Sequence, residues 1–368
     1  MKVSIIGNTS RNIGVACAGD FSLAGHEVRF AVFADQSAHI AQAIASGELA
    51  LEGDSKNSIS GRTGRSTLRS IGADPVAAVD GAEIVILDIA MQEIVGRFGD
   101  LATGLAPGAL VHVQSYGCWA SCLLTPLLRH AGRKDVLVTE AAAPSTFAKF
   151  SGETVTPMTL RRGLALASMP GSMIGPAVKK LAPLFPGLIA ADSVLQTGLG
   201  NINLMVHPAI VLLGVGMCER AELLGQKISF YREANVPSAG RLADLLDRER
   251  ANVCEAYGVG YQSLPKTLEV TYGAEGRNAY DAIRTCGPYQ NNVNTSPDLW
   301  RGWLRDDVPF AVAPLVRLGE QAGLRLPLHR AVAEIFGAIL EFDPWAGPDL
   351  ATLGLEGRPA EVMARVRS

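Results

Sequence analysis

The chain has 368 residues, of which 48% are hydrophobic and 19% charged, a balance typical of a soluble globular protein of about two domains. A formal net charge of −3, with no dense Lys/Arg cluster, argues against nucleic acid as a partner. The apolar runs are too short to span a bilayer, and there is no signal-peptide pattern. The six cysteines include no C-x-x-C pair. These features favour a cytoplasmic protein with reduced thiols.

The first half of the chain alternates strand and helix patterns. Such alternation predicts a doubly wound parallel sheet, so we expect an α/β domain of the Rossmann type. Buried-strand runs are predicted at 2–6, 26–33, 82–87, 109–114, 136–139 and 163–169, and helices at 14–24 and 176–184.

Beyond about residue 190 the pattern changes to long amphipathic helices joined by turns that contain Gly and Pro. We therefore expect a dinucleotide-binding Rossmann domain at residues 1–189 and an all-α substrate and catalytic domain at 190–368. The predicted helices are 208–224, 237–257, 309–322 and 328–340.

A glycine-bounded loop, Gly7-Asn-Thr-Ser-Arg-Asn-Ile-Gly14, joins the first predicted strand to the first helix. In the dinucleotide fingerprint G-x-G-x-x-G, the glycines permit a tight turn and let the backbone approach a pyrophosphate at the helix start. Here the middle glycine is absent and the loop is two residues longer, so a strand–helix loop without a ligand is the alternative. The expected cofactor-binding residues are Gly7, Asn8, Thr9, Ser10, Arg11 and Gly14.

The end of the second predicted strand bears on the choice of cofactor. It reads Phe30-Ala-Val-Phe33, without the acidic residue that takes the ribose hydroxyls of NAD. A neutral strand end, together with Ser10 and Arg11, tolerates a 2′-phosphate better than a carboxylate would. NADP is therefore favoured over NAD, with a solvated surface arginine as the alternative for Arg11, and no metal is expected.

The apolar run from residue 194 to 213 contains Asn203 and His207, four residues apart. On a helix both side chains would share one face, where buried polar groups need hydrogen-bond partners such as a polar substrate. A satisfied core histidine is the alternative. Because Pro208 disfavours helical geometry at His207, we expect a kink or a new helix there, with His207 near a helix N-terminus.

Together these segments resemble the octopine/nopaline dehydrogenase family, the opine dehydrogenases. The resemblance implies a Rossmann domain and a helical domain with the active site in the cleft between them. It also implies reduction, by NADH or NADPH, of the imine formed from a 2-oxo acid and the amino group of an amino acid, and the reverse oxidation. The specific segments are N-x-x-x-H-P at 203–208 and Asp-Asp-Val-Pro at 306–309; 2–33, 80–86, 137–140 and 164–170 add weaker support.

The resemblance implies catalytic roles for three residues. His207 matches the family's catalytic histidine, Asn203 the asparagine before it, and Asp307 the aspartate that pairs with the histidine. An imidazole gives and takes a proton near neutral pH, while a carboxylate fixes its tautomer and raises its basicity. The alternative role of Asp307 is to cap a helix that begins at Pro309.

The sequence departs from the family where a substrate carboxylate is expected to bind. Family members commonly carry an arginine five residues before the aspartate, but here that position is Gly302, with Arg301 and Arg305 nearby. Glu140 is expected either beside the nicotinamide or substrate, or at the surface. Five aromatic residues of the helical half are expected to pack in the core or to line an amine pocket: Tyr257, Tyr261, Tyr289, Trp300 and Trp303.

Two other functions remain open. A 2-hydroxy-acid or ketopantoate-type reductase shares the two-domain plan but reduces a carbonyl without an amine. A non-catalytic nicotinamide-nucleotide-binding protein would bind the cofactor without turnover. The sequence does not identify the oxo acid, the amine, the physiological direction or the oligomeric state, for which a homodimer is one option.

Overall fold

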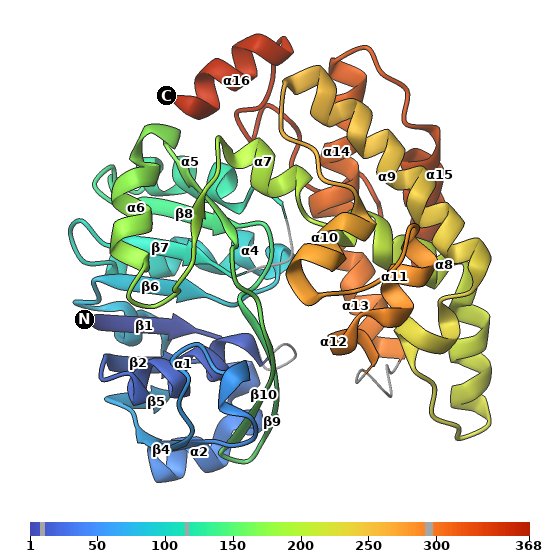
Figure 1. Ribbon diagram of the computed structural model, residues 1–368. Coiled ribbons are helices and arrows are strands. Elements are labelled where there is room, and N and C mark those ends of the chain that lie inside the picture. The colour runs from blue at the N-terminus through green and yellow to red at the C-terminus, as the bar shows by residue number, and fades with distance from the viewer. Residues whose placement is uncertain (8–11, 115–117, 291–296) are drawn as a thin grey trace. The chain divides into compact units, whose positions relative to one another are not determined.

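The chain folds into two compact units, and Figure 1 labels most of their helices and strands. In the computed structural model the described residues are 1–7, 12–114, 118–290 and 297–368, with the backbone alone for 297–299. The first unit contains residues 1–115, 119–197 and 366–368, and the second contains 116–118 and 198–365.

The first unit is built on an eight-stranded sheet with the order β12-β11-β8-β7-β6-β1-β2-β5. The six strands from β8 to β5 run parallel, whereas β11 pairs antiparallel with β8. The predicted fold class is thus confirmed, with two strands at one edge, β11 and β12, that run antiparallel to the other six. The strands are β1 (Lys2–Ile6), β2 (Glu27–Ala31), β5 (Ser70–Gly72), β6 (Ile84–Leu87), β7 (Leu110–Val113), β8 (Leu137–Ala141), β11 (Ala165–Met169) and β12 (Ile189–Ala190).

Burial explains why the central strands read as continuous apolar runs. Every residue of β6 and β7 is buried, as in a parallel sheet that helices cover on both faces. The helices of this unit are α1 (Ile13–Leu23), α2 (Ala41–Ser46), α3 (Pro75–Val79), α4 (Met91–Gly104), α5 (Ala120–His130), α6 (Ile174–Leu181) and α7 (Val194–Leu199), with short 3-10 turns η1 (Ala34–Ile40), η2 (Ser55–Asn57) and η3 (Gly171–Met173).

A second, four-stranded sheet packs against α1 and was not predicted from the sequence. The α1 residue Asp20 anchors it, because its buried carboxylate accepts hydrogen bonds from the backbone of Ile59 and from the amide and hydroxyl of Ser60. Burial raises the pKa of Asp20, although these bonds oppose the rise. The sheet order is β4-β3-β10-β9, with β3 (Glu48–Leu51), β4 (Gly64–Thr67), β9 (Thr146–Ser151) and β10 (Thr154–Leu160).

The second unit is helical, as predicted. Its α9 has the predicted bounds and α15 begins one residue before its predicted start. Two π-helical turns, η4 and η5, interrupt the pattern. The elements are α8 (Asn203–Leu223), η4 (Phe230–Ala234), α9 (Pro237–Tyr257), α10 (Leu264–Tyr272), α11 (Ala279–Thr285), α12 (Gly287–Gln290), α13 (Pro297–Asp307), η5 (Val308–Val312), α14 (Ala313–Gln321), α15 (Pro327–Leu340) and α16 (Pro359–Arg367).

The prediction that a helix begins or kinks at Pro208 was wrong about the start. Helix α8 begins at Asn203, whose amide donates to the Asn201 side-chain oxygen, and it continues through Pro208. Residues 203–211 are all buried, so packing outweighs the backbone hydrogen bond that the proline cannot make. His207 consequently lies in the second turn of a long helix.

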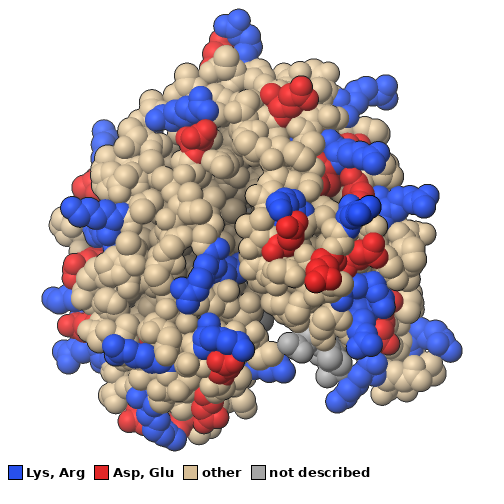
Figure 2. Space-filling view, viewed as in Figure 1, with Lys and Arg blue, Asp and Glu red and all other residues tan. Residues whose placement is uncertain are grey.

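The apolar stretch around α8 is also longer than the sequence suggested. By length and hydropathy alone, Val194–Leu223 could cross a membrane, but 72% of its most apolar window is buried inside the protein. A core helix of a globular domain passes the same test. On the face shown in Figure 2, basic and acidic side chains are interspersed, which agrees with the small net charge.

Candidate active site

His207 and Asp307 form a buried pair inside the helical unit. The His207 Nδ1 atom lies 2.7 Å from Asp307 Oδ2, and 7% and 2% of the two side chains are exposed. Because a carboxylate can only accept hydrogen bonds, the imidazole hydrogen is assigned to Nδ1 and the lone pair to Nε2. The geometry therefore makes Nε2 the nitrogen that can exchange a proton.

Asp307 lies within a continuous run of helix and does not act as a helix cap. Asp307 ends α13, and the chain continues without a break through the π-helical turn η5 into α14. Its side chain makes no capping hydrogen bond. The alternative prediction of an N-cap before Pro309 is therefore wrong, since helix α13 precedes Asp307 and no helix starts afresh there.

Tyr231 lies on the other side of the imidazole, and the sequence did not single it out. Its hydroxyl oxygen is 2.9 Å from His207 Nε2, and the residue is buried. It is carried by the π-helical turn η4, a backbone form that occurs often at functional sites. The only sequence signal was a pair of aromatic residues, Phe230-Tyr231, between two predicted helices.

Aromatic rings pack around this group. Trp303 stacks on His207 with ring centroids 4.6 Å apart, and Tyr289 stacks on Tyr231 at 4.1 Å. Phe230 meets the Trp303 ring edge-on. Of the five aromatics singled out from the sequence, Trp303 and Tyr289 thus lie at this group. Tyr257 instead donates its hydroxyl to the Leu318 carbonyl in the helical core.

Asn203 begins α8 one turn before His207, so both side chains share one helix face as predicted. The residue is 6% exposed. Among the described residues, none forms a hydrogen bond with its carboxamide, although its backbone amide is bonded. A buried amide with free hydrogen-bonding capacity is suited to bind a polar ligand.

The arginines near Gly302 are engaged within the helical unit. Arg305 donates to the Leu340 carbonyl at 2.7 Å, and Arg301 lies 3.7 Å from Glu219 and over the Trp300 ring. A Cβ atom added at Gly302 would meet no atom within 4 Å.

In the first unit, Gly7 and Gly14 bring β1, α1 and β6 close together. A Cβ atom on Gly14 would lie 3.1 Å from Gly7 Cα and 3.2 Å from Asp88 Cβ, and one on Gly7 would lie 2.6 Å from the Phe30 ring. The Gly14 amide donates to Asp88 Oδ2 at 2.6 Å. The close approach is what a dinucleotide loop requires. The other expected cofactor contacts, Asn8, Thr9, Ser10 and Arg11, lie outside the described residues.

The end of β2 carries a basic group that the sequence did not reveal. The Arg97 guanidinium of α4 lies 4.3 Å from the centre of the Phe33 ring. It also binds Asp35 through two nitrogens, at 3.0 and 2.9 Å, which lowers the pKa of that carboxyl. An Arg97–Asp35 ion pair thus lies beside the neutral strand end from which NADP was predicted.

Glu140 is not a surface residue, and its carboxylate already accepts several hydrogen bonds. It accepts hydrogen bonds from the Ser121 amide and hydroxyl and from the Thr197 hydroxyl, each at 2.8 Å. Burial raises its pKa, and these bonds oppose the rise. Glu140 therefore fixes the start of α5 to the end of α7, and the surface alternative was wrong.

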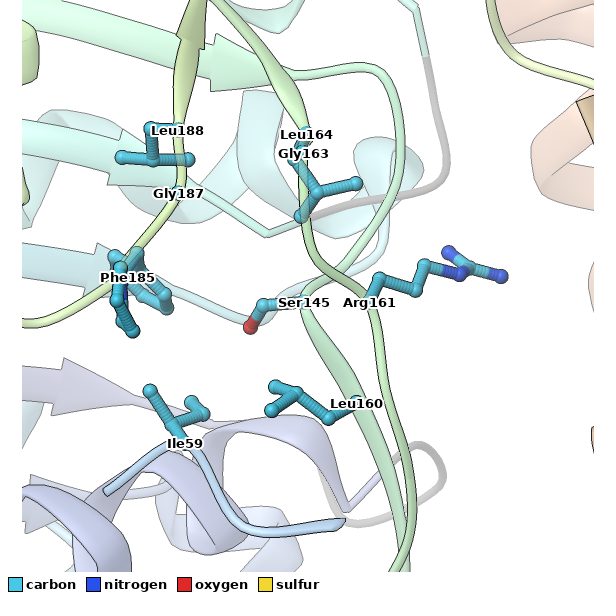
Figure 3. A pocket seen from close by; sticks show the side chains of 10 residues that line it. Ile59, Ser145, Leu160, Arg161, Gly163, Leu164, Phe185, Gly187 and Leu188 are labelled. Carbon is cyan, nitrogen blue, oxygen red and sulfur yellow. The ribbon is translucent and has the colours of Figure 1, made fainter. Parts of the chain in front are cut away.

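A small cavity in the first unit does not serve as a substrate site. Its volume is about 10 Å³, roughly the space of one water molecule. In Figure 3 the Ser145 hydroxyl points into the hollow, whereas the Arg161 guanidinium points away from it.

Comparisons with known proteins agree with these observations. Residues 190–340 match the family model described as "NAD/NADP octopine/nopaline dehydrogenase, alpha-helical domain". An opine dehydrogenase from Arthrobacter sp. (strain 1C) is 24% identical over 290 residues, which are 77% of this chain and 78% of that protein.

Solved structures share the fold. An octopine dehydrogenase with NADH and L-arginine has a TM-score of 0.76 at 20% identity, covering 99% of this chain and 98% of that one. A ketopantoate reductase from Ralstonia eutropha has a TM-score of 0.59 at 21% identity, covering 93% and 99%. A Rossmann-type unit with a helical unit that holds a buried His–Asp pair defines an NAD(P)-dependent dehydrogenase. Within this class, the helical unit matches the octopine/nopaline dehydrogenase family, and an opine dehydrogenase is a relative over 77% of the chain, so the resemblance predicted from the sequence is confirmed.

Proposed function

We propose that the protein condenses a 2-oxo acid with the amino group of an amino acid or related amine and reduces the product to a secondary amine. The reverse oxidation uses the same groups. The observation that carries this proposal is the His207–Asp307 pair within the segment that matches the opine dehydrogenase family. In this proposal residues 1–189 bind the dinucleotide and 190–368 supply the catalytic groups.

Three side chains have separate roles in the proposed reaction. His207 is the source of the proton that reaches the carbonyl-derived oxygen as water leaves, and it recovers that proton in the reverse direction. Asp307 holds the imidazole by its Nδ1–H and stabilises the imidazolium. Asn203 offers its carboxamide to a polar group of the substrate. A bound nicotinamide cofactor supplies the hydride for the imine carbon.

NADP(H) is the proposed preferred cofactor. The glycines at positions 7 and 14 fit a dinucleotide, because they leave no side chain between β1 and the start of α1. The Arg97 guanidinium at the end of β2 can receive a 2′-phosphate. Arg11 stays in the proposal as a second phosphate contact.

The test is to mix 2-oxo acids with amino acids and follow both cofactor oxidation and product mass. NADPH should be consumed quickly only when both substrates are present, and the product should be a secondary amine that retains the oxo-acid skeleton. Rapid reduction of an oxo acid alone to a hydroxy acid would instead establish a ketopantoate-type reductase, whose fold this chain shares. Tight cofactor binding without any turnover would establish a nucleotide-binding protein.

We also propose that the protein works in the cytoplasm as a homodimer. Its six cysteines are buried and form no disulfide, which suits a reducing compartment. Leu213 and Met217, four residues apart on α8, are 44% and 43% exposed and offer an apolar face to a second copy. Light scattering should give twice the mass of the chain, and a single-chain mass would refute the dimer.

A further inference from the structure

The direction of the hydrogen bond between Tyr231 and His207 follows from the aspartate. With the hydrogen of the imidazole held on Nδ1 by Asp307, Nε2 is an acceptor, so the Tyr231 hydroxyl must donate to it. When His207 is protonated, Nε2 becomes a donor and the bond must reverse. The Tyr231 O–H is then turned away from the imidazole and can donate to another oxygen.

The tyrosine is held in a fixed position for such a reversal. Its ring lies between Tyr289, stacked at 4.1 Å and 13°, and Phe230, which meets it edge-on at 5.0 Å. Tyr231 and His207 are both 6% exposed, so little water reaches their contact. Among the described residues, His207 Nε2 has one hydrogen-bond partner, the Tyr231 hydroxyl.

We propose that Tyr231 is a catalytic residue that carries the proton between His207 and the substrate oxygen. This inference rests on the proposed function. It assigns to the family's His–Asp pair a third member that contacts the substrate directly. The relay has the order Asp307, His207, Tyr231, substrate.

The proposed step balances in atoms and charge. As the carbinolamine loses water, the Nε2–H bond of the imidazolium breaks and its proton moves to the Tyr231 oxygen. The Tyr231 O–H proton moves at the same time to the carbinolamine hydroxyl, the carbon–oxygen bond breaks, and water leaves. Neutral His207, neutral Tyr231 and the iminium ion remain, so the tyrosine ends unchanged.

The experiment compares Tyr231→Phe with the wild type on the best substrate pair. We expect kcat to fall by about 10- to 100-fold, with little change in KM for either substrate. Solvent isotope effects in mixtures of light and heavy water should follow a curve for two transferred protons in the wild type and a straight line for one proton in the variant. Tyr257→Phe is the matched control, because it removes another buried hydroxyl of this unit, bonded to Leu318, and should leave kcat unchanged.

Each outcome bears on one proposal. If the wild type shows no amine-dependent turnover, the proposed function fails and the relay fails with it. If the wild type is active and Tyr231→Phe keeps its kcat and its two-proton curve, only the relay is overturned. A rise in KM with kcat unchanged likewise overturns it, because Tyr231 would then bind substrate without moving a proton.

A second substitution covers the case in which Tyr231→Phe does not fold. Fluorinated tyrosine at position 231 keeps the ring, its stacking and the hydroxyl, but lowers the phenol pKa. We expect it to fold and to move the alkaline limb of the kcat profile to lower pH. An unmoved limb in the folded protein overturns the relay.

Discussion

Several side chains in the helical unit are polar and buried, and they need hydrogen-bond partners that apolar packing alone does not provide. His207 has a partner at each ring nitrogen, and the carboxylate at Nδ1 decides which nitrogen is basic. Removing one member of such a chain changes the protonation of the others and not only their positions. A substitution that changes the charge of one side chain, with little change in its shape, therefore tests the role of that side chain.

Asp307→Asn keeps the size of the side chain but removes its charge. We expect the fold and melting temperature to be retained, and kcat to fall by roughly two to four orders of magnitude. The alkaline limb of the pH profile should move to lower pH, because an amide stabilises the imidazolium less well. Asp306→Asn is the control, since no hydrogen bond joins Asp306 to His207. A wild-type rate and profile for Asp307→Asn would contradict the assigned role.

Arg97→Ala tests the cofactor preference. We expect the Kd of NADPH to rise by about 10- to 100-fold, equivalent to roughly 1–3 kcal/mol for a charge-assisted hydrogen bond, and that of NADH to stay within twofold. Titration of cofactor fluorescence measures both. Arg65→Ala removes another ion-paired arginine, which binds Glu48 and Glu153, and should change neither Kd. Equal weakening of the two cofactors by Arg97→Ala would remove this arginine from the 2′-phosphate site.

At the scale of elements, the contact between β1 and α1 depends on glycine. Gly14→Ala would place a Cβ atom 3.1 Å from Gly7 Cα, so the helix start must shift. We expect unfolding free energy to fall by about 1–3 kcal/mol and cofactor binding to weaken, as measured by denaturation and by titration. Gly99→Ala in α4 is the control, because its new Cβ meets no atom within 4 Å and should be neutral or slightly stabilising. Similar results for both variants would show that the approach is not tight.

The sequence predicted the elements whose burial pattern is simple. The fully buried strands β6 and β7 were found because each is a continuous apolar run, and the amphipathic α9 was found because a helical period dominates it. The second sheet was missed because its hairpin, β9 and β10, is half-exposed and β10 contains Pro157. The start of α8 was misplaced because the Asn203 amide finds an acceptor in the Asn201 side chain and tertiary packing overrides the local preference of Pro208.

The candidate site likewise contains residues that the sequence predicted and residues that it did not. The pairing of His207 with Asp307 was expected from their motifs, although 100 positions separate them. Tyr231 and Arg97 were not, because each acts through a contact between elements that no local spacing encodes. A π-helical turn such as η4 has no sequence period of its own, so the direction of Tyr231 is visible only in the structure.

At the scale of the whole molecule, each unit contains a buried histidine whose pKa is lowered, so that folding favours its neutral form. His112 in β7 is bonded to the Thr139 hydroxyl, and burial lowers its pKa to about 3. His329 at the start of α15 is bonded to Glu249, and burial again lowers its pKa despite that carboxylate. Its Nε2 atom is buried and has no hydrogen-bond partner among the described residues, so protonation there would leave an unsatisfied N–H.

Both histidines should therefore make the protein less stable in acid. In the unfolded chain each histidine takes up a proton near its ordinary pKa of 6.5. In the folded chain it stays neutral until the pH falls to its lower folded pKa. The stability that the two histidines contribute is present above pH 6.5. It is lost as the pH falls, at up to about 1.4 kcal/mol per pH unit for each histidine. Unfolding by denaturant between pH 7.5 and 5 measures this slope. His329→Gln keeps a donor for Glu249 without a titrating ring and should reduce the slope, whereas His130→Gln, on the exposed end of α5, should not. An unchanged slope in His329→Gln would mean that His329 does not control the acid stability of its unit.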